Sequence, residues 1–293
     1  MIWATSRFSI DLSQPRVMGI VNVTPDSFSD GGHYAQTHAA LAHCEALLRD
    51  GADILDIGGE STRPNAPPVP LDEELARVLP VVQHAVTLGV PVSVDTYKPA
   101  VMRAVLDLGA DIINDVWALR WQGVDGLLGS DVVVQHGRCG VCLMHMHREP
   151  QTMQAAPMDG DVVAQVLSFL ELHAQYLRGL GVENTRICID PGIGFGKTVE
   201  QNFRLLGCQA RLAALGFPVL AGWSRKSSLV AVTQTSLGSA ATLDRSERMV
   251  PSVAAALLAV ERGASVVRVH DVKESVQALK VWLAMASAQN NNP

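Results

Sequence analysis

The stretch DGADILDIGGESTRP, residues 50–64, decides the fold of this chain. A glycine turn leads directly into an aliphatic run of strand length, and that run ends in glycines and polar residues. Glycine just past a helix end adopts the left-handed conformation at little cost. The same order of helix, glycine turn and strand recurs around Gly109 and Gly263, which predicts repeated βα units.

Eight short aliphatic runs follow this pattern along the chain. Because each is almost continuously apolar, the runs predict parallel strands that are covered on both faces. A layer of eight parallel strands can close without edges, which favours an α/β fold of the (β/α)8 TIM-barrel type over an open doubly wound sheet. The predicted strands are 18–23, 52–58, 90–95, 110–116, 141–146, 186–192, 218–222 and 265–270.

No linker or low-complexity segment divides the chain, so we expect one domain over residues 1–286. The segment before Val17 is expected to form a short strand or hairpin that caps the base of the barrel. Residues 287–293 are expected to be a disordered tail.

Composition narrows the function class. The 293 residues are 48% hydrophobic and 18% charged, as in ordinary globular proteins, and the net charge of −6 gives no basic footprint for nucleic acid. Neither a signal peptide nor an apolar run of roughly 20 residues is apparent, so we expect no membrane partner and a cytoplasmic location. Five cysteines, an odd number, do not suggest a disulfide framework.

Each predicted strand delivers a polar group to its carboxyl end, where barrels of this type place their functional groups. Helix capping explains some of them, and Asp115 is expected to hold a turn. Carboxylates and an amide suit a flat ring with N–H donors, such as a 2-amino-4-oxo pyrimidine. These are Asp95, Asn114 and Asp190. Cations and hydrogen-bond donors suit a phosphate or diphosphate. These are Arg63, Lys226, Arg268 and His270, and the neutral oxygens of Asn22 and Thr62 suit Mg²⁺ or hydrogen bonds.

The glycine-rich segment 190–198 fits neither a P-loop, because Pro191 stands where the first glycine is needed, nor a dinucleotide fingerprint, because Lys197 stands at its third position. It is better interpreted as a turn that lets a ligand ring approach the backbone. Phe195 is then exposed for stacking, or is a loop residue that covers the barrel top. The polar and proline-rich segments 24–32 and 60–70 are either mobile lids or plain connectors.

The cysteines and histidines of segment 136–147 look superficially like a zinc site. Cys142, Met144 and Met146 alternate along a predicted strand, so Cys142 is expected to point into packing. Cys139 falls in the preceding turn, and such a pair does not present tetrahedral ligands.

The blocks MGIVNVTPDSFSDGG (18–32), GGESTRP (58–64), DPGIGFGKT (190–198) and SRKS (224–227) together resemble the dihydropteroate synthases. The resemblance covers nearly the whole chain in the right order. It implies condensation of 6-hydroxymethyl-7,8-dihydropterin diphosphate with 4-aminobenzoate to give 7,8-dihydropteroate and diphosphate in folate biosynthesis, inhibition by sulfonamides, a Mg²⁺ cofactor and a homodimer. Trp223 and Tyr97 depart mildly from the family pattern.

The resemblance also implies roles for single residues. The pterin diphosphate would be bound by Thr62, Asp95, Asn114, Asp190, Lys226, Arg268 and His270, and Mg²⁺ by Asn22. The aminobenzoate pocket would involve Phe28, Pro64, Phe195 and Ser227. Asp95, Lys226 and Arg63 would be catalytic, in an SN1-like cleavage of the pterin C–O bond. Two alternatives stay open: a methyltetrahydrofolate-binding methyltransferase barrel, and a pterin-binding paralogue without catalysis.

Overall fold

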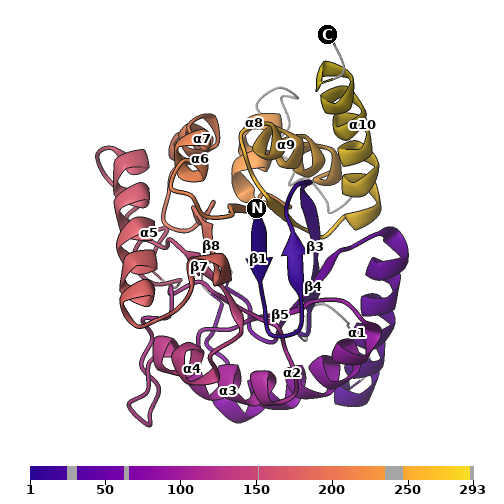
Figure 1. Cartoon of the computed structure of the whole chain (residues 1–293), viewed down its shortest axis with the longest axis vertical. Helices are drawn as coiled ribbons and strands as arrows, with labels where there is room; N and C mark the ends of the chain where they lie inside the picture. Colours follow the sequence, from indigo (N-terminus) through magenta and orange to yellow (C-terminus); the bar gives the residue numbers. More distant parts are fainter. Residues whose placement is uncertain (25–31, 63–65, 151, 235–246, 291–293) are drawn as a thin grey trace.

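Eight parallel strands form the central sheet in the computed structural model, which describes residues 1–24, 32–62, 66–150, 152–234 and 247–290 (Figure 1). The strand order is β8-β7-β6-β5-β4-β3-β10-β9, and a parallel bridge between Ile189 and Val219 joins the two outer strands into a barrel. All eight predicted strands are confirmed. They are β3 (Arg16–Asn22), β4 (Ile54–Gly58), β5 (Val92–Asp95), β6 (Ile112–Asp115), β7 (Gly140–Met144), β8 (Ile187–Asp190), β9 (Leu220–Ala221) and β10 (Val266–Val269).

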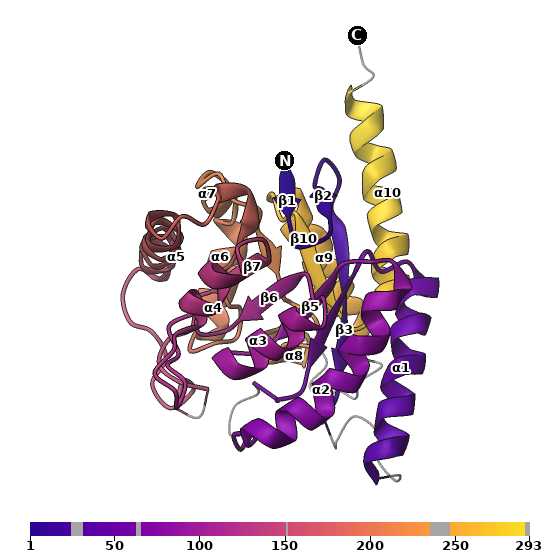
Figure 2. The ribbon, with the colours of Figure 1, turned by 60° about the horizontal axis from the view of Figure 1, so that its bottom comes forward.

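Helices surround the barrel, and the main apolar core lies between the two layers (Figure 2). The predicted glycine turns are confirmed, since Gly51, Gly109 and Gly263 have φ of 100°, 99° and 92°. The helices are α1 (Gly32–Asp50), α2 (Leu71–Ala85), α3 (Pro99–Asp107), α4 (Gly129–His136), α5 (Val162–Gly179), α6 (Val199–Gly207), α7 (Ala210–Ala213), α8 (Ser227–Gln234), α9 (Met249–Glu261) and α10 (Val272–Asn290).

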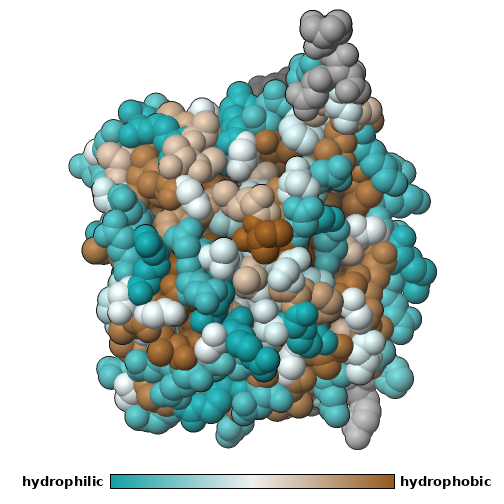
Figure 3. Space-filling model, viewed as in Figure 1, coloured by the Kyte–Doolittle hydropathy of each residue, from teal (hydrophilic) through white to brown (hydrophobic). Residues whose placement is uncertain are grey.

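An antiparallel hairpin of β1 (Ile2–Ala4) and β2 (Ser9–Asp11) closes the base of the barrel, as expected. Trp3 is fully buried and its indole N–H donates to the Arg186 carbonyl at 3.0 Å. The hairpin packs on the residues that fill the lower barrel, which are Met18, Ile54, Ile112, Cys142, Cys188, Leu220 and Val266. On the outer face of this end, hydrophilic and hydrophobic residues are interspersed (Figure 3).

The barrel interior changes from apolar to polar along several of its strands. Successive side chains of a strand point to opposite faces, so a residue two positions beyond a lower-barrel residue points inward as well. Asp56 and Asp190 stand in this relation to Ile54 and Cys188. The upper barrel is therefore lined by groups that can bind a polar ligand, above a sealed apolar base.

The carboxyl terminus differs from the expectation. Helix α10 continues through Ser287 to Asn290, so the prediction of disorder from residue 287 is wrong for these four residues. Ala288 and Gln289 of this segment are good helix formers, and they extend the preceding helical turns. Within the described residues, no helix is long and apolar enough to cross a membrane.

Candidate active site

An arginine between two carboxylates occupies the centre of the barrel mouth. Arg268 of β10 donates from Nε to Asp56 at 2.6 Å and from Nη2 to Asp95 at 2.7 Å. Asn114 lies close to Asp56, with its Nδ2 at 3.4 and 3.5 Å from the two carboxylate oxygens. Neither β6 nor β10 is a sheet neighbour of β4, so these contacts cross the barrel interior.

Burial governs the electrostatics of this group. It raises the pKa of Asp95 to about 7; Arg268 opposes the rise, and the Asp56 carboxylate adds to it. Burial alone would lower the pKa of Arg268, but Asp56 and Asp95 hold it above its ordinary value. The mouth therefore holds the Arg268 cation beside a carboxyl group whose pKa is shifted toward neutral pH.

Asp190 and Lys226 form the other side of the mouth. Burial raises the pKa of Asp190, while the N–H of Gly192, which donates to Oδ1 at 2.7 Å, and Lys226 oppose the rise. The Lys226 ammonium lies 4.3 Å from the centre of the Phe195 ring.

Phe195 is 8% exposed and packs among Val116, Met144, Met146 and Met153. The expectation of a freely exposed stacking ring is therefore wrong, and the alternative, a loop residue that covers the barrel top, describes it better. Met144 at the end of β7 and the residues of the loops, Met146 and Met153 among them, enclose most of the ring, so it forms a wall of the mouth beneath Lys226.

Lys197 holds the glycine-rich loop from inside, a role that the sequence pattern did not indicate. Its ammonium is buried and contacts the carbonyls of Gly192, Phe195 and His145 at 2.8, 3.1 and 3.3 Å. It also lies 3.0 Å from Nδ1 of His145. Since a lysine has only three N–H donors, these acceptors saturate it. Lys197 therefore fixes the loop backbone rather than binding a phosphate.

Three further predicted residues lie around the rim. Ser224 contacts the Nδ1 of His270 at 2.9 Å and also accepts the His270 backbone N–H, which orients the imidazole. Asn22 ends β3 half-buried beside Gly58, and Ser227 is exposed at the start of α8. Asp115 accepts the backbone N–H groups of Trp117 and Leu119, so the turn-holding role expected for it is confirmed.

Among the described residues, no group of three or more histidines, cysteines or acidic residues could hold a metal ion. Mg²⁺ commonly takes one or two protein oxygens together with substrate phosphate oxygens and waters. The amide oxygen of Asn22 could serve as one such protein ligand. Cys142 is buried inside the lower barrel and Cys139 in the preceding turn, so the packing interpretation of these cysteines is supported over zinc.

Some predicted positions lie outside the described residues: Phe28, Arg63 and Pro64. Thr62 is described and is half-buried two positions beyond Glu60. Glu60 belongs to a second polar group around Lys98, which the sequence pattern also did not indicate.

Comparison with known proteins identifies the family. The model of the pterin binding enzyme family matches residues 18–270. Dihydropteroate synthase of Neisseria meningitidis serogroup B is 48% identical over 289 residues, covering 97% of each chain. The Burkholderia cenocepacia dihydropteroate synthase complexed with 7,8-dihydropteroate has a TM-score of 0.86 and 49% identity, covering 99% of this chain and 98% of that one.

The Yersinia pestis dihydropteroate synthase solved with a sulfonamide drug complex has a TM-score of 0.88 and 39% identity, covering 98% of this chain and 100% of that one. In each of these three comparisons, the match covers nearly the full length of both proteins compared. The chain belongs to the pterin-binding barrel enzymes and, within them, to the dihydropteroate synthases.

Proposed function

We infer that this chain joins 6-hydroxymethyl-7,8-dihydropterin diphosphate to 4-aminobenzoate, giving 7,8-dihydropteroate and diphosphate in folate biosynthesis. The observation that carries this function is the set of acceptors in the upper barrel, the buried Asn114 and Asp190 and the Asp95 carboxylate, 13% exposed, beside the Arg268 guanidinium. A pterin ring presents adjacent N–H donors, so buried carboxylate and amide oxygens suit it better than water does. The product complex of the Burkholderia relative supports the assignment.

The pterin diphosphate is held at two ends. Asp95, Asn114 and Asp190 accept hydrogen bonds from the ring, and Lys226 lies over Phe195 close to Asp190. The diphosphate meets the cationic rim, to which we assign Thr62, Arg63, Arg268 and His270. The Ser224 contact fixes the His270 ring for this purpose.

Bond breaking sets the barrier. An aromatic amine is unprotonated at neutral pH, so attack needs no strong general base. The reaction is SN1-like: the pterin C–O bond breaks, both of its electrons leave with the diphosphate, and the amine nitrogen then bonds to the methylene carbon and loses a proton. Asp95 stabilises the cationic methylene, while Lys226, Arg63 and Arg268 stabilise the leaving group. A Mg²⁺ ion bound at Asn22 would supply further charge neutralisation for the diphosphate.

The 4-aminobenzoate site is proposed next to Phe195 and Ser227, with Phe28 and Pro64. Ser227 supports this placement because it begins α8 directly after Lys226 and is exposed. A hydroxyl and backbone N–H groups at a helix start suit a carboxylate.

An assay of dihydropteroate formation with sulfonamide competition tests the function. We expect turnover of both substrates and competition between sulfonamide and 4-aminobenzoate. Asp95→Asn and Lys226→Ala should each lose most of the activity, and wild-type turnover in both would overturn the site assignment. A rate that depends steeply on the basicity of substituted anilines would contradict the dissociative step.

The same assay separates the alternatives. A methyltransferase barrel would bind methyltetrahydrofolate, need a corrinoid partner and form no dihydropteroate. A non-catalytic paralogue would bind the pterin without turnover. The ESTRP and SRKS blocks favour the synthase over a methyltransferase barrel, and the complete polar rim favours it over a non-catalytic paralogue.

We further propose a cytoplasmic homodimer. Helices α9 and α10 pack against each other and expose large apolar side chains, which makes them the surface we assign to the dimer. These side chains are Val250, Leu258, Val281 and Met285.

A further inference from the structure

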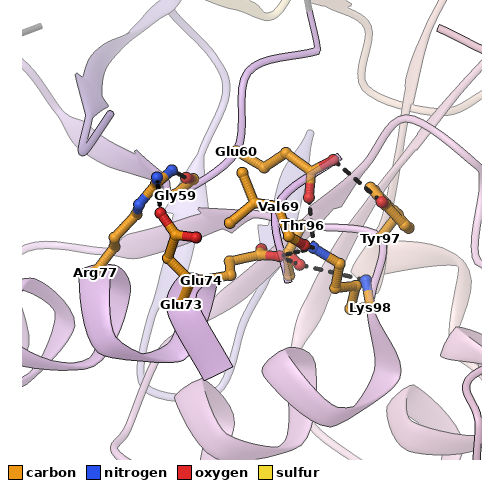
Figure 4. Close-up of polar contacts among 9 residues, drawn as sticks. All are labelled: Gly59, Glu60, Val69, Glu73, Glu74, Arg77, Thr96, Tyr97 and Lys98. Carbon is orange, nitrogen blue, oxygen red and sulfur yellow. Dashed lines mark hydrogen bonds and ion pairs between the residues drawn. The ribbon is translucent and has the colours of Figure 1, made fainter. Parts of the chain in front are cut away.

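Lys98 joins three segments of the chain just outside the barrel mouth (Figure 4). Its ammonium contacts the Glu60 carboxylate, the Glu74 carboxylate at 2.5 Å and the Val69 carbonyl at 2.6 Å. Glu60 follows β4, Val69 precedes α2, and Glu74 lies in the first turn of α2. A single cation thus joins both ends of segment 60–69 to the helix that follows.

Neighbouring groups reinforce the same attachment. The Tyr97 hydroxyl lies 3.1 Å from a Glu60 oxygen, and Thr96 donates to Glu74 at 2.7 Å. Arg77 of α2 donates to the Gly59 carbonyl at 2.7 Å, immediately before Glu60. The start of the segment is therefore held through both its backbone and its first side chain.

Burial makes this arrangement depend on the lysine. The Glu74 side chain is 1% exposed, that of Glu60 9% and that of Lys98 15%. Two carboxylates this poorly hydrated repel each other unless a cation lies between them. Without the ammonium, the easiest relief is for Glu60 to move away toward water, because Glu74 is fixed in a helix.

We propose that Lys98 is a positioning residue for the reaction, acting through Glu60 on Thr62. Thr62 is two residues beyond Glu60, and Lys98 is three residues beyond Asp95, so the contact fixes the rim after β4 relative to the rim after β5. The inference rests on the proposed assignment of Thr62 to the pterin diphosphate. It deepens that function by naming what sets the geometry of the diphosphate end.

Lys98→Met tests the proposal against a matched control, Arg7→Met. Arg7 pairs with the fully buried Asp111 at 2.6 Å, at the base of the barrel, so its loss also leaves a buried carboxylate without its cation. We expect both variants to lower the Tm. Only Lys98→Met should lower kcat, by about 100-fold, because a displacement of about 1 Å in a positioning group has that effect.

Three further measurements distinguish positioning from general loss of structure. In Lys98→Met, the Kd for 6-hydroxymethylpterin, which lacks the diphosphate, should equal that of the unaltered protein. Lys98→Arg should recover much of kcat. Tyr97→Phe keeps the ring beside Trp117 and Trp121 but loses the contact with Glu60, and kcat should fall about fivefold.

A double-mutant cycle that combines Lys98→Met with Thr62→Val tests whether Lys98 acts through Thr62. If Lys98 acts through Thr62, the double variant should be scarcely slower than Lys98→Met alone. Fully additive effects, or equal kcat in Lys98→Met and Arg7→Met, would overturn the proposal. Unchanged turnover in Asp95→Asn would instead overturn the proposed pterin site, so the two failures are distinguishable.

Discussion

At the scale of single residues, Asp95 carries a charge that depends on pH in the working range. Burial raises its pKa from 3.8 to about 7, so it protonates near neutrality rather than in acid. Since the ionised form is the one that stabilises the pterin methylene, we expect kcat/KM for the pterin diphosphate to fall about tenfold per pH unit below that value. The sign is opposite for stability, because ionisation of a buried carboxyl as pH rises weakens the fold.

Steady-state pH profiles check this prediction. Asp95→Asn should lower the plateau and remove the acidic limb, because an amide does not titrate there. An unaltered limb in Asp95→Asn would assign the titration elsewhere, for example to Asp190, whose pKa burial also raises.

At the scale of elements, the β1–β2 hairpin contributes to stability and not to the chemistry. Trp3 is fully buried among the residues that fill the lower barrel, so Trp3→Ala should reduce the free energy of unfolding by about 3–5 kcal/mol. Urea unfolding measures this loss, with the more exposed Ile2→Ala as control. A kcat reduced in the folded variant would contradict the separation of base and mouth.

The loop after β8 depends on glycine for space as well as conformation. Gly192 has φ of +67°, and a Cβ there would lie 1.9 Å from the His145 carbonyl oxygen. Gly181 has φ of +90° with no atom within 4 Å of its Cβ position, so Gly181→Ala measures conformational strain alone. We expect Gly181→Ala to lower the free energy of unfolding by about 1–2 kcal/mol. Gly192→Ala should cause a much larger loss of stability and of turnover. Equal values in thermal unfolding would contradict the steric argument.

At the scale of the whole molecule, the proposed dimer surface makes a prediction of its own. A charge at Val250 or Val281, which are 67% and 72% exposed, would meet apolar surface across the α9–α10 face. Val250→Glu combined with Val281→Glu should shift the sedimentation coefficient from dimer to monomer while helicity is retained. A sedimentation coefficient that does not change would place the contact elsewhere, and Leu172→Glu on α5 is the matched control.

The sequence predicts the barrel because local patterns determine it. The aliphatic runs determine the strands, and the glycine turns place the helix ends. Polar strand ends such as Asp95 and Asp190 predict the mouth. Pairing across the barrel has no local pattern, so the contact of Arg268 with Asp56 and Asp95 could not be foreseen.

The same reason explains the buried lysines. Lys98 and Lys197 look like ordinary loop cations in the sequence, and only the folded chain surrounds them with carbonyls and carboxylates. The sequence alone does not decide whether Phe195 is exposed or covers the barrel top, because the residues that pack against it come from other parts of the chain.

The hairpin under the barrel also has a kinetic consequence. Among the described residues, Trp3 and the apolar lower layer fill the base of the barrel, so we expect both ligands to enter through the mouth. Because the proposed pterin site lies deeper than the proposed 4-aminobenzoate site, we expect the pterin diphosphate to bind before 4-aminobenzoate. Dihydropteroate would occupy both substrate positions. We therefore expect it to compete with the pterin diphosphate for binding, as a product inhibitor.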